Sequence, residues 1–345
     1  MQLELRKPLT DGYNQMKGLL FRPFRAETWF TIGFSAFLIA LGEGGGLNLP
    51  GNFLPESMKS KVGNGDPSAL LEGVDWVGLG IGLGFLLVIF ATGLTWVSSR
   101  GTFMFLDNLA TGQAQIGGPW KQYAAQANSL FAWRMIVGSI ALIGSVPLMV
   151  ALLIGFIVRI AGSKATESFG ELLSKLPASL QNPTNELLIG LSILFLIWIV
   201  FFILLNLVTH DFVVPFMYKR RVAVLAAWGS VWPVVSGIVG SIILYGLFKL
   251  VLRFAVGLGL ILALALTCCL LAIPLVIPYI GTVCMLPVTA TFQYFNLFYL
   301  RQLGPDFDVF TTALATPETG LYVPPEQRPP AGPADSENPY YPYKS

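Results

Sequence analysis

Polar or charged side chains stand at the ends of three long apolar stretches, and residues of these types could do chemistry there. Arg100 follows one stretch, His210 and Asp211 follow the second, and Thr291 holds the matching place after the third. An arginine and a carboxylate can form a bidentate, geometrically specific ion pair. We expect Arg100 and Asp211 to pair at the mouth of a helix bundle if the stretches converge. The pair would be a gate or a headgroup site, or only a contact that stabilises the fold; alternatively, both groups stay in water.

Acid–base catalysis is the other chemistry that His210 and Asp211 could perform. No nucleophile motif or second carboxylate accompanies them, and the patterns Gly-x-Ser-x-Gly and His-Glu-x-x-His do not occur. One histidine and three cysteines argue against a metal centre made by the protein alone. We therefore predict that the protein is not an enzyme and holds no cofactor or metal.

A run of three basic residues follows the His210–Asp211 pair. Lys219, Arg220 and Arg221 are consecutive. Basic residues beside a membrane span favour the cytoplasmic side, and they also attract anionic lipid headgroups. The triplet is thus interpreted as a determinant of orientation and as a set of candidate headgroup contacts.

Glycines alternate along the start of one apolar stretch. Gly78 and Gly82 form one pair with three residues between them, and Gly80 and Gly84 form another. Such small-residue pairs let membrane helices approach closely, and these two lie on roughly opposite faces of a helix. We predict that all four glycines serve helix packing.

The composition identifies the environment that must position these residues. The chain has 345 residues, of which 54% are hydrophobic and 12% are charged, whereas soluble domains are about 25% charged. A net charge of +2 without a basic block excludes nucleic acid as the expected partner. The sequence predicts a polytopic integral membrane protein.

Uncharged stretches give the expected membrane spans, each requiring about 20 apolar residues. The clearest are 76–99, 135–158 and 187–208, and Trp198 within the last should pack against a neighbouring helix. A shorter stretch covers 28–42. The remaining two spans are 229–252, with Lys249 reaching an interface, and 258–287, kinked at its prolines, so that 249–256 would connect them.

Lysine and arginine set the expected orientation. Fourteen of them fall in the terminal segments and the 100–134 and 209–228 connections, against seven in the other three connections. Because basic residues favour the cytoplasmic side, both termini are predicted to be cytoplasmic.

The six spans form three successive pairs that resemble one another. The pairs are 28–99, 133–208 and 229–300, and a tryptophan opens each. We therefore predict an all-α, polytopic transmembrane bundle of six spans, built as three pseudo-repeated helical hairpins with interfacial amphipathic helices.

Two segments flank this predicted domain of residues 28–305. Residues 1–27 form a cytosolic or interfacial segment, whose apolar residues have helical spacing and predict an amphipathic helix: Leu9, Tyr13, Met16 and Leu20. Residues 306–345 are rich in proline and tyrosine and are expected to be a disordered cytosolic tail.

The hairpins, their leading tryptophans and one segment carry a resemblance to known proteins. The segment reads Thr209-His210-Asp211-Phe212-Val213-Val214-Pro215 and is followed by Arg220-Arg221. Over most of residues 10–305, the chain resembles uncharacterised prokaryotic six-span families that are similar to the membrane domain of some glycerophosphodiester phosphodiesterases. The catalytic domain of those enzymes is absent, so the resemblance implies a fold and no enzymatic residue.

Two functions remain open at this point. The first is a non-enzymatic membrane protein that binds lipid or a membrane protein partner as a scaffold or accessory subunit. The alternative is a transporter or channel for lipids or small molecules, with a polar gate near Arg100 and Asp211. The resemblance places the protein in a prokaryotic inner membrane, with its oligomeric state open.

Overall fold

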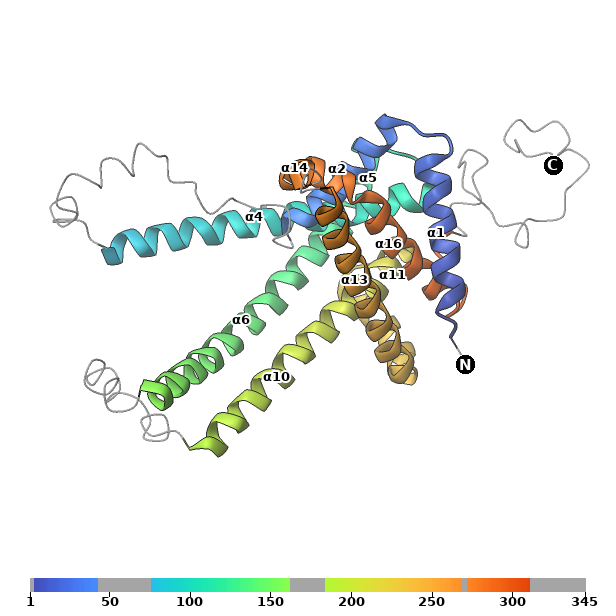
Figure 1. Ribbon diagram of the computed structural model, residues 1–345. Helices are drawn as coiled ribbons and strands as arrows, with labels where there is room; N and C mark the ends of the chain where they lie inside the picture. The colour runs from blue at the N-terminus through green and yellow to red at the C-terminus, as the bar shows by residue number, and fades with distance from the viewer. Residues whose placement is uncertain (1–2, 43–75, 162–183, 268–271, 311–345) are drawn as a thin grey trace, which may run out of the picture. The chain divides into compact units, whose positions relative to one another are not determined.

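Every regular element in the described part of the chain is helical. The computed structural model describes residues 3–42, 76–161, 184–267 and 272–310 (Figure 1). The helices are α1 (Arg6–Phe21), α2 (Ala26–Gly42), α4 (Trp76–Thr111), α5 (Gly117–Gln122), α6 (Ala124–Ala161), α10 (Asn185–Val208), α11 (Val214–Arg220), α12 (Val224–Gly237), α13 (Val239–Leu266), α14 (Ala272–Val276), α15 (Pro278–Cys284) and α16 (Leu286–Arg301), with a π-helical turn η1 (Thr209–Val213) between α10 and α11. The predicted all-α class is confirmed.

The chain divides into two compact units. The larger unit comprises Met1–Phe131 and Val214–Ser345, and the smaller comprises Ala132–Val213. The smaller unit thus holds most of α6, all of α10 and the turn η1. The bounds of the smaller unit lie close to those of the second predicted hairpin, 133–208, whereas the first and third predicted hairpins both fall in the larger unit.

Helix α4 contains both an exposed half and a buried half. Its 36 residues extend about 54 Å at 1.5 Å per residue. Phe85 is 68% exposed in the first half, which matches the predicted span 76–99, whereas Phe103 and Leu109 are fully buried in the second half. The core of the larger unit is therefore built around the end of α4 that extends beyond the predicted span.

Close contact between α2 and α4 depends on a glycine. A Cβ atom placed on Gly101 would lie 2.6 Å from Cβ of Leu38, too close for any larger residue without a shift. Gly82 and Gly84 have open space at the Cβ position among the described residues. The helix-packing role of Gly78, Gly80, Gly82 and Gly84 stays a prediction.

The N-terminal helix α1 lies beside α16 (Figure 1). A Cβ atom on Gly12 would stand 2.8 Å from the backbone nitrogen of Phe295, which shows how closely the two helices approach. Of the predicted apolar stripe, Met16 and Leu20 are buried, but Tyr13 is 51% exposed. The helix is confirmed. Its buried face contacts α16, and Tyr13 lies on the opposite, exposed face.

The predicted connection at 249–256 is wrong. Helix α13 runs without a break from Val239 to Leu266, and Lys249 is buried within it. Its ammonium lies 5.8 Å from the ring centroid of Tyr245, one turn earlier on the same helix. Two basic residues in an apolar stretch indicated a surface loop, but here the first of them is covered by tertiary packing.

Prolines mark breaks in the last part of the chain, as predicted. Pro278 begins α15 and Pro287 is the second residue of α16, where a missing N–H costs no helical hydrogen bond. The helices α15 and α16 are bent by 58° relative to each other. The predicted single kinked span is therefore a sequence of short helices.

Four helical segments are long and apolar enough to cross a membrane: Gly84–Thr111, Ala124–Arg159, Asn185–Arg220 and Val239–Leu266. A fifth candidate arises if the bent pair α15 and α16 counts as one span. Helices α2 and α12 are apolar but shorter. The described residues therefore do not confirm six spans or a threefold repeat.

Candidate functional site

Arg100 lies in the larger unit, between two tryptophan rings. Its guanidinium carbon is 5.0 Å from the ring centroid of Trp96 and 5.3 Å from that of Trp120. One terminal nitrogen donates to the backbone oxygen of Trp120 at 2.9 Å, and the other donates to Oδ1 of Asn128 at 3.3 Å. Arg100 thus joins α4, α5 and α6 through its planar guanidinium.

His210 and Asp211 lie in the π-helical turn η1 of the smaller unit. Nδ1 of His210 is 3.2 Å from Oδ1 of Asp211, and the Asp211 side chain is almost fully buried. In the same unit, Nε1 of Trp133 donates to Oγ1 of Thr209 at 3.4 Å. Arg100 belongs to the other compact unit, so its ion pair with Asp211 stays a prediction.

Thr291 is occupied by its own helix. Its hydroxyl donates to the backbone oxygen of Pro287 at 2.6 Å, one turn earlier in α16. Thr291 and Arg100 therefore have different surroundings, although they hold matching places at the ends of two apolar stretches in the sequence.

Two residues of the basic triplet bind the segment that follows α16. Nζ of Lys219 donates to the backbone oxygens of Pro305 and, at 2.6 Å, Asp308. Arg220 forms an ion pair with Asp306. These contacts give Lys219 and Arg220 an intramolecular role, and the headgroup contacts of Lys219, Arg220 and Arg221 stay a prediction.

The segment 305–310 is consequently part of the core. Phe307, Val309 and Phe310 are each at most 5% exposed, and the Phe310 ring lies 5.0 Å from that of Phe298. Arg301 at the end of α16 pairs with Asp308 at 3.1 Å. The boundary expected for a disordered tail at residue 306 is therefore too early; residues 311–345 lie outside the described part of the chain.

A buried polar network joins α4 and α11 to Tyr123, which lies between α5 and α6. The Tyr218 hydroxyl donates to Oδ1 of Asp107 at 2.9 Å, and the Tyr218 ring stacks on that of Tyr123 with centroids 4.9 Å apart. Burial raises the pKa of Tyr123 to about 12, so its hydroxyl keeps its proton at neutral pH. Sequence reasoning missed this network; the available signal was an aspartate within the apolar run that follows Arg100.

The exposed residue Arg221 contacts the network through the Tyr123 ring. Its guanidinium lies 4.9 Å from the Tyr123 ring centroid, and its own backbone has a positive φ of 55°. Glycine is preferred at such a left-handed position after a helix. The chain tolerates arginine here because the side chain covers Tyr123, while the backbone oxygen accepts a hydrogen bond from Gln126 at 3.0 Å.

A second buried polar cluster surrounds Lys249. The Tyr245 hydroxyl donates to Oδ1 of Asn296 at 3.2 Å, and the Tyr245 ring stacks on Tyr299 at 4.5 Å. All of these residues lie on α13 or α16. The Lys249 ammonium lies over the Tyr245 ring, and α16 holds that ring through Asn296 and Tyr299, so the packing of α16 on this part of α13 accompanies the burial of the lysine.

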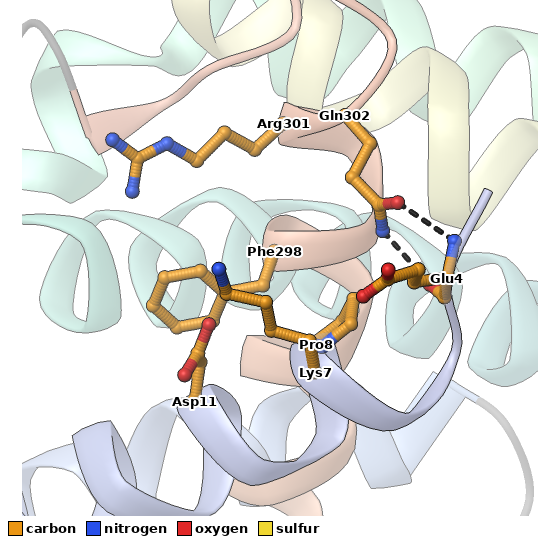
Figure 2. A pocket seen from close by; sticks show the side chains of 7 residues that line it. All are labelled: Glu4, Lys7, Pro8, Asp11, Phe298, Arg301 and Gln302. Carbon is orange, nitrogen blue, oxygen red and sulfur yellow. Dashed lines mark hydrogen bonds between the residues drawn. The ribbon is translucent and has the colours of Figure 1, made fainter. Parts of the chain in front are cut away.

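A pocket of about 350 Å³ opens between the start of α1 and the end of α16 (Figure 2). Two reciprocal hydrogen bonds of 2.9 Å join Gln302 to the backbone of Glu4 and close one side. The side chains that line the pocket include Glu4, Lys7, Asp11, Phe298, Arg301 and Gln302. It is the described feature that combines a ligand-sized space with charges of both signs.

Metal-binding geometry does not occur in the ranges that the structure describes. No group of three or more His, Cys, Asp or Glu side chains there could hold a metal ion. The charged groups named above contact tryptophan rings, backbone oxygens and one another, and these contacts are those of a structural core or a binding site.

The fold and these sites define an all-helical membrane protein with four to five apolar helices of spanning length. The chain belongs to a family of unknown function, DUF7544, whose model matches residues 6–300. No curated protein and no solved structure matches the chain. The resemblance to the membrane domain of glycerophosphodiester phosphodiesterases receives no support from the family match.

Proposed function

We propose that this protein is a non-enzymatic integral membrane protein that binds lipid or a membrane protein partner, as a scaffold or accessory subunit. The observation that carries the proposal is the smaller unit, which consists of two long apolar helices with little mutual packing. Such helices require an apolar environment along most of their length, since few of the described side chains of the unit cover them, and a lipid or a partner protein would provide it.

The contact between α6 and α10 within the smaller unit is narrow. The Trp198 ring lies against Gly144, where no larger residue would fit, and Nε1 of Trp198 donates to the backbone oxygen of Ala141 at 3.4 Å. This contact agrees with the expected packing of Trp198. Elsewhere on α10, Ile193 and Ile197 are 53% and 60% exposed. Exposed apolar patches of this size on spanning helices favour lipid or protein partners.

The charged groups in the core of the larger unit support a structural role. Arg100 joins three helices, and Lys219 and Arg220 bind the 305–310 segment. A catalytic group must instead contact a reacting substrate.

Extraction with native lipids tests the proposal. The full chain would be isolated in a lipid-preserving polymer, and the molecules that co-purify would be identified by mass spectrometry. A lipid or protein in reproducible stoichiometry supports the proposal. A monodisperse protein that carries only bulk membrane lipid contradicts it.

A matched pair of variants on α10 sharpens this experiment. Replacing Ile193 and Ile197 with alanine reduces the exposed apolar surface and should lower the recovered partner severalfold. Ser192→Ala is the control, because the Ser192 hydroxyl donates to Leu188 in its own helix at 2.8 Å. Equal recovery from both variants would show that this face of α10 does not bind the partner.

The proposal includes a location and a topology. We place the protein in a prokaryotic inner membrane, as the resemblance implies, and its termini in the cytoplasm, as the lysine and arginine distribution indicates. Six crossings would require α2 and α12 to contribute beyond their helical lengths of 17 and 14 residues. Cysteine labelling from either side of the membrane tests the topology.

A transporter or channel is the second candidate, and the π-helical turn favours it. Such turns are rare and frequently occur at functional sites, and η1 carries the nearly buried Asp211 beside His210. Flux into liposomes should then depend on Asp211. An Asp211→Asn variant that folds normally but loses flux would support a gate, whereas loss of the folded protein would assign Asp211 to the fold.

A further inference from the structure

We propose that the pocket between α1 and α16 binds a small zwitterion that carries a phosphate and a primary ammonium group. This inference goes beyond the proposed scaffold role, which depends on the apolar helices. The pocket lies in the larger unit, and both of its walls come from the closely packed pair α1 and α16 (Figure 2).

The charges that line the pocket indicate a ligand with both signs. Lys7 and Arg301 contribute two positive charges, and Glu4 and Asp11 contribute two negative charges. These opposite charges offset each other, so neither a simple anion nor a simple cation gains a net attraction from the lining. A zwitterion can place each of its charges near the opposite charge, so the lining favours it over either simple ion.

The basic residues favour a phosphate as the anionic group. Arg301 approaches from α16 and Lys7 from α1, so a phosphate could be contacted from two helices (Figure 2). A guanidinium has five N–H donors in a planar fork, and the pairing of Arg301 Nε with Asp308 is compatible with a second acceptor. Arginine and lysine together are a common combination for phosphate recognition.

The remaining lining favours a primary ammonium over a quaternary one. Quaternary ammonium groups are bound by cages of several aromatic rings, and this pocket offers the single ring of Phe298. A primary ammonium instead donates three hydrogen bonds, which the carboxylates of Glu4 and Asp11 can accept. The volume of about 350 Å³ is near the small end of ligand pockets and suits a molecule of headgroup size.

Calorimetry on the full chain tests the assignment. The protein would be placed in nanodiscs without ethanolamine lipids and titrated with O-phosphoethanolamine, inorganic phosphate or ethanolamine. We expect O-phosphoethanolamine to bind at least about tenfold more tightly than either single-charge probe, since each charge-assisted contact contributes about that factor. Equal or absent binding of all three probes would overturn the proposal.

Two neighbouring basic residues give a matched pair of variants. Lys7→Gln should weaken the binding of O-phosphoethanolamine about tenfold. Arg6→Gln, in the same turn of α1 but outside the pocket lining, should leave it unchanged. Equal weakening by both variants would show that the ligand responds to surface charge and not to this pocket.

The carboxylates and the ligand source have their own tests. Asp11→Asn should remove much of the preference for O-phosphoethanolamine over phosphate.

Nanodiscs with phosphatidylethanolamine should compete with the soluble probe if a lipid headgroup is the natural ligand. Without competition, the ligand is a soluble molecule with the same chemistry. Lys7→Gln and Asp11→Asn leave the apolar helices α6 and α10 unchanged. Recovery of a membrane partner therefore reports separately on the scaffold role.

Discussion

The two halves of helix α4 differ both in polarity and in surroundings: residues 76–93 carry no charge, whereas residues 94–111 include Arg100 and Asp107. Phe85 and Ile89 in the first half are more than 50% exposed, whereas Phe103 and Leu106 in the second half are at most 1% exposed. The first half fits a bilayer, which covers it without specific contacts. The second half fits a protein core, where each side chain has fixed neighbours. The buried half is therefore the more polar one, because its charged side chains find partners within the protein core.

The largest expected effect distinguishes two phenylalanines of this helix. Phe103→Ala should lower the free energy of unfolding by about 3–5 kcal/mol, because it leaves a cavity where the Phe103 ring stacks on Tyr123. Phe85→Ala should cost less than about 1 kcal/mol, since the Phe85 side chain is 68% exposed. Chemical unfolding in detergent micelles measures both; equal losses would mean that the halves do not differ as described.

Glycine substitutions extend the comparison to backbone contacts. Gly101→Ala should destabilise the protein by about 1–3 kcal/mol, because the new methyl group would overlap Leu38. Gly82→Ala should be neutral or stabilising by up to about 1 kcal/mol, since alanine favours the helix and the space is open. Thermal unfolding of the two variants checks the prediction. A destabilised Gly82→Ala protein would instead reveal a partner helix at that face.

The buried network near the end of α4 should be sensitive to a single oxygen atom. Tyr218→Phe removes the hydroxyl that donates to Asp107 and should cost about 1–3 kcal/mol, because the buried carboxylate loses a donor. Tyr13→Phe on the exposed face of α1 serves as the control and should have little effect. Denaturant midpoints of both variants give the measurement, and similar midpoints would contradict the role of the network.

The smallest expected effects concern the segment 305–310. Lys219→Met should increase hydrogen exchange in this segment by several fold, since two backbone oxygens lose their donor. Arg220→Gln should have a weaker effect, because the exposed ion pair with Asp306 contributes about 1 kcal/mol or less. Exchange measured by mass spectrometry separates the two. A larger effect of Arg220→Gln would show that the ion pair holds the segment.

Several features of the fold could be read from local sequence. The helices that contain the predicted spans 76–99, 135–158 and 187–208 all form, and the prolines at 278 and 287 lie at helix starts as expected. Hydrophobic length and proline geometry are local properties, so no knowledge of neighbours was needed. The connection expected at 249–256 failed for the complementary reason: the burial of Lys249 accompanies the packing of α16 on this part of α13, which is a tertiary contact.

The candidate site likewise combines residues that the sequence indicates locally with partners that only the tertiary structure supplies. Arg100 was recognised as significant, but its partners Trp120 and Asn128 lie 20 and 28 residues away in the chain. The pocket between α1 and α16 joins Glu4 to Gln302, which are 298 residues apart. No spacing rule connects such positions, because long-range contacts depend on how helices cross.

The sequence by itself determined that this protein is helical and apolar enough for a membrane. Composition and periodicity are sums over neighbouring residues, and they fix the solvent in which each helix is stable. Only the tertiary structure decided which charges are buried, which glycines bring helices together and where a ligand could bind. Those properties depend on close contacts between residues that are distant in the chain, and a difference of a few ångströms decides whether a side chain meets protein, lipid or water.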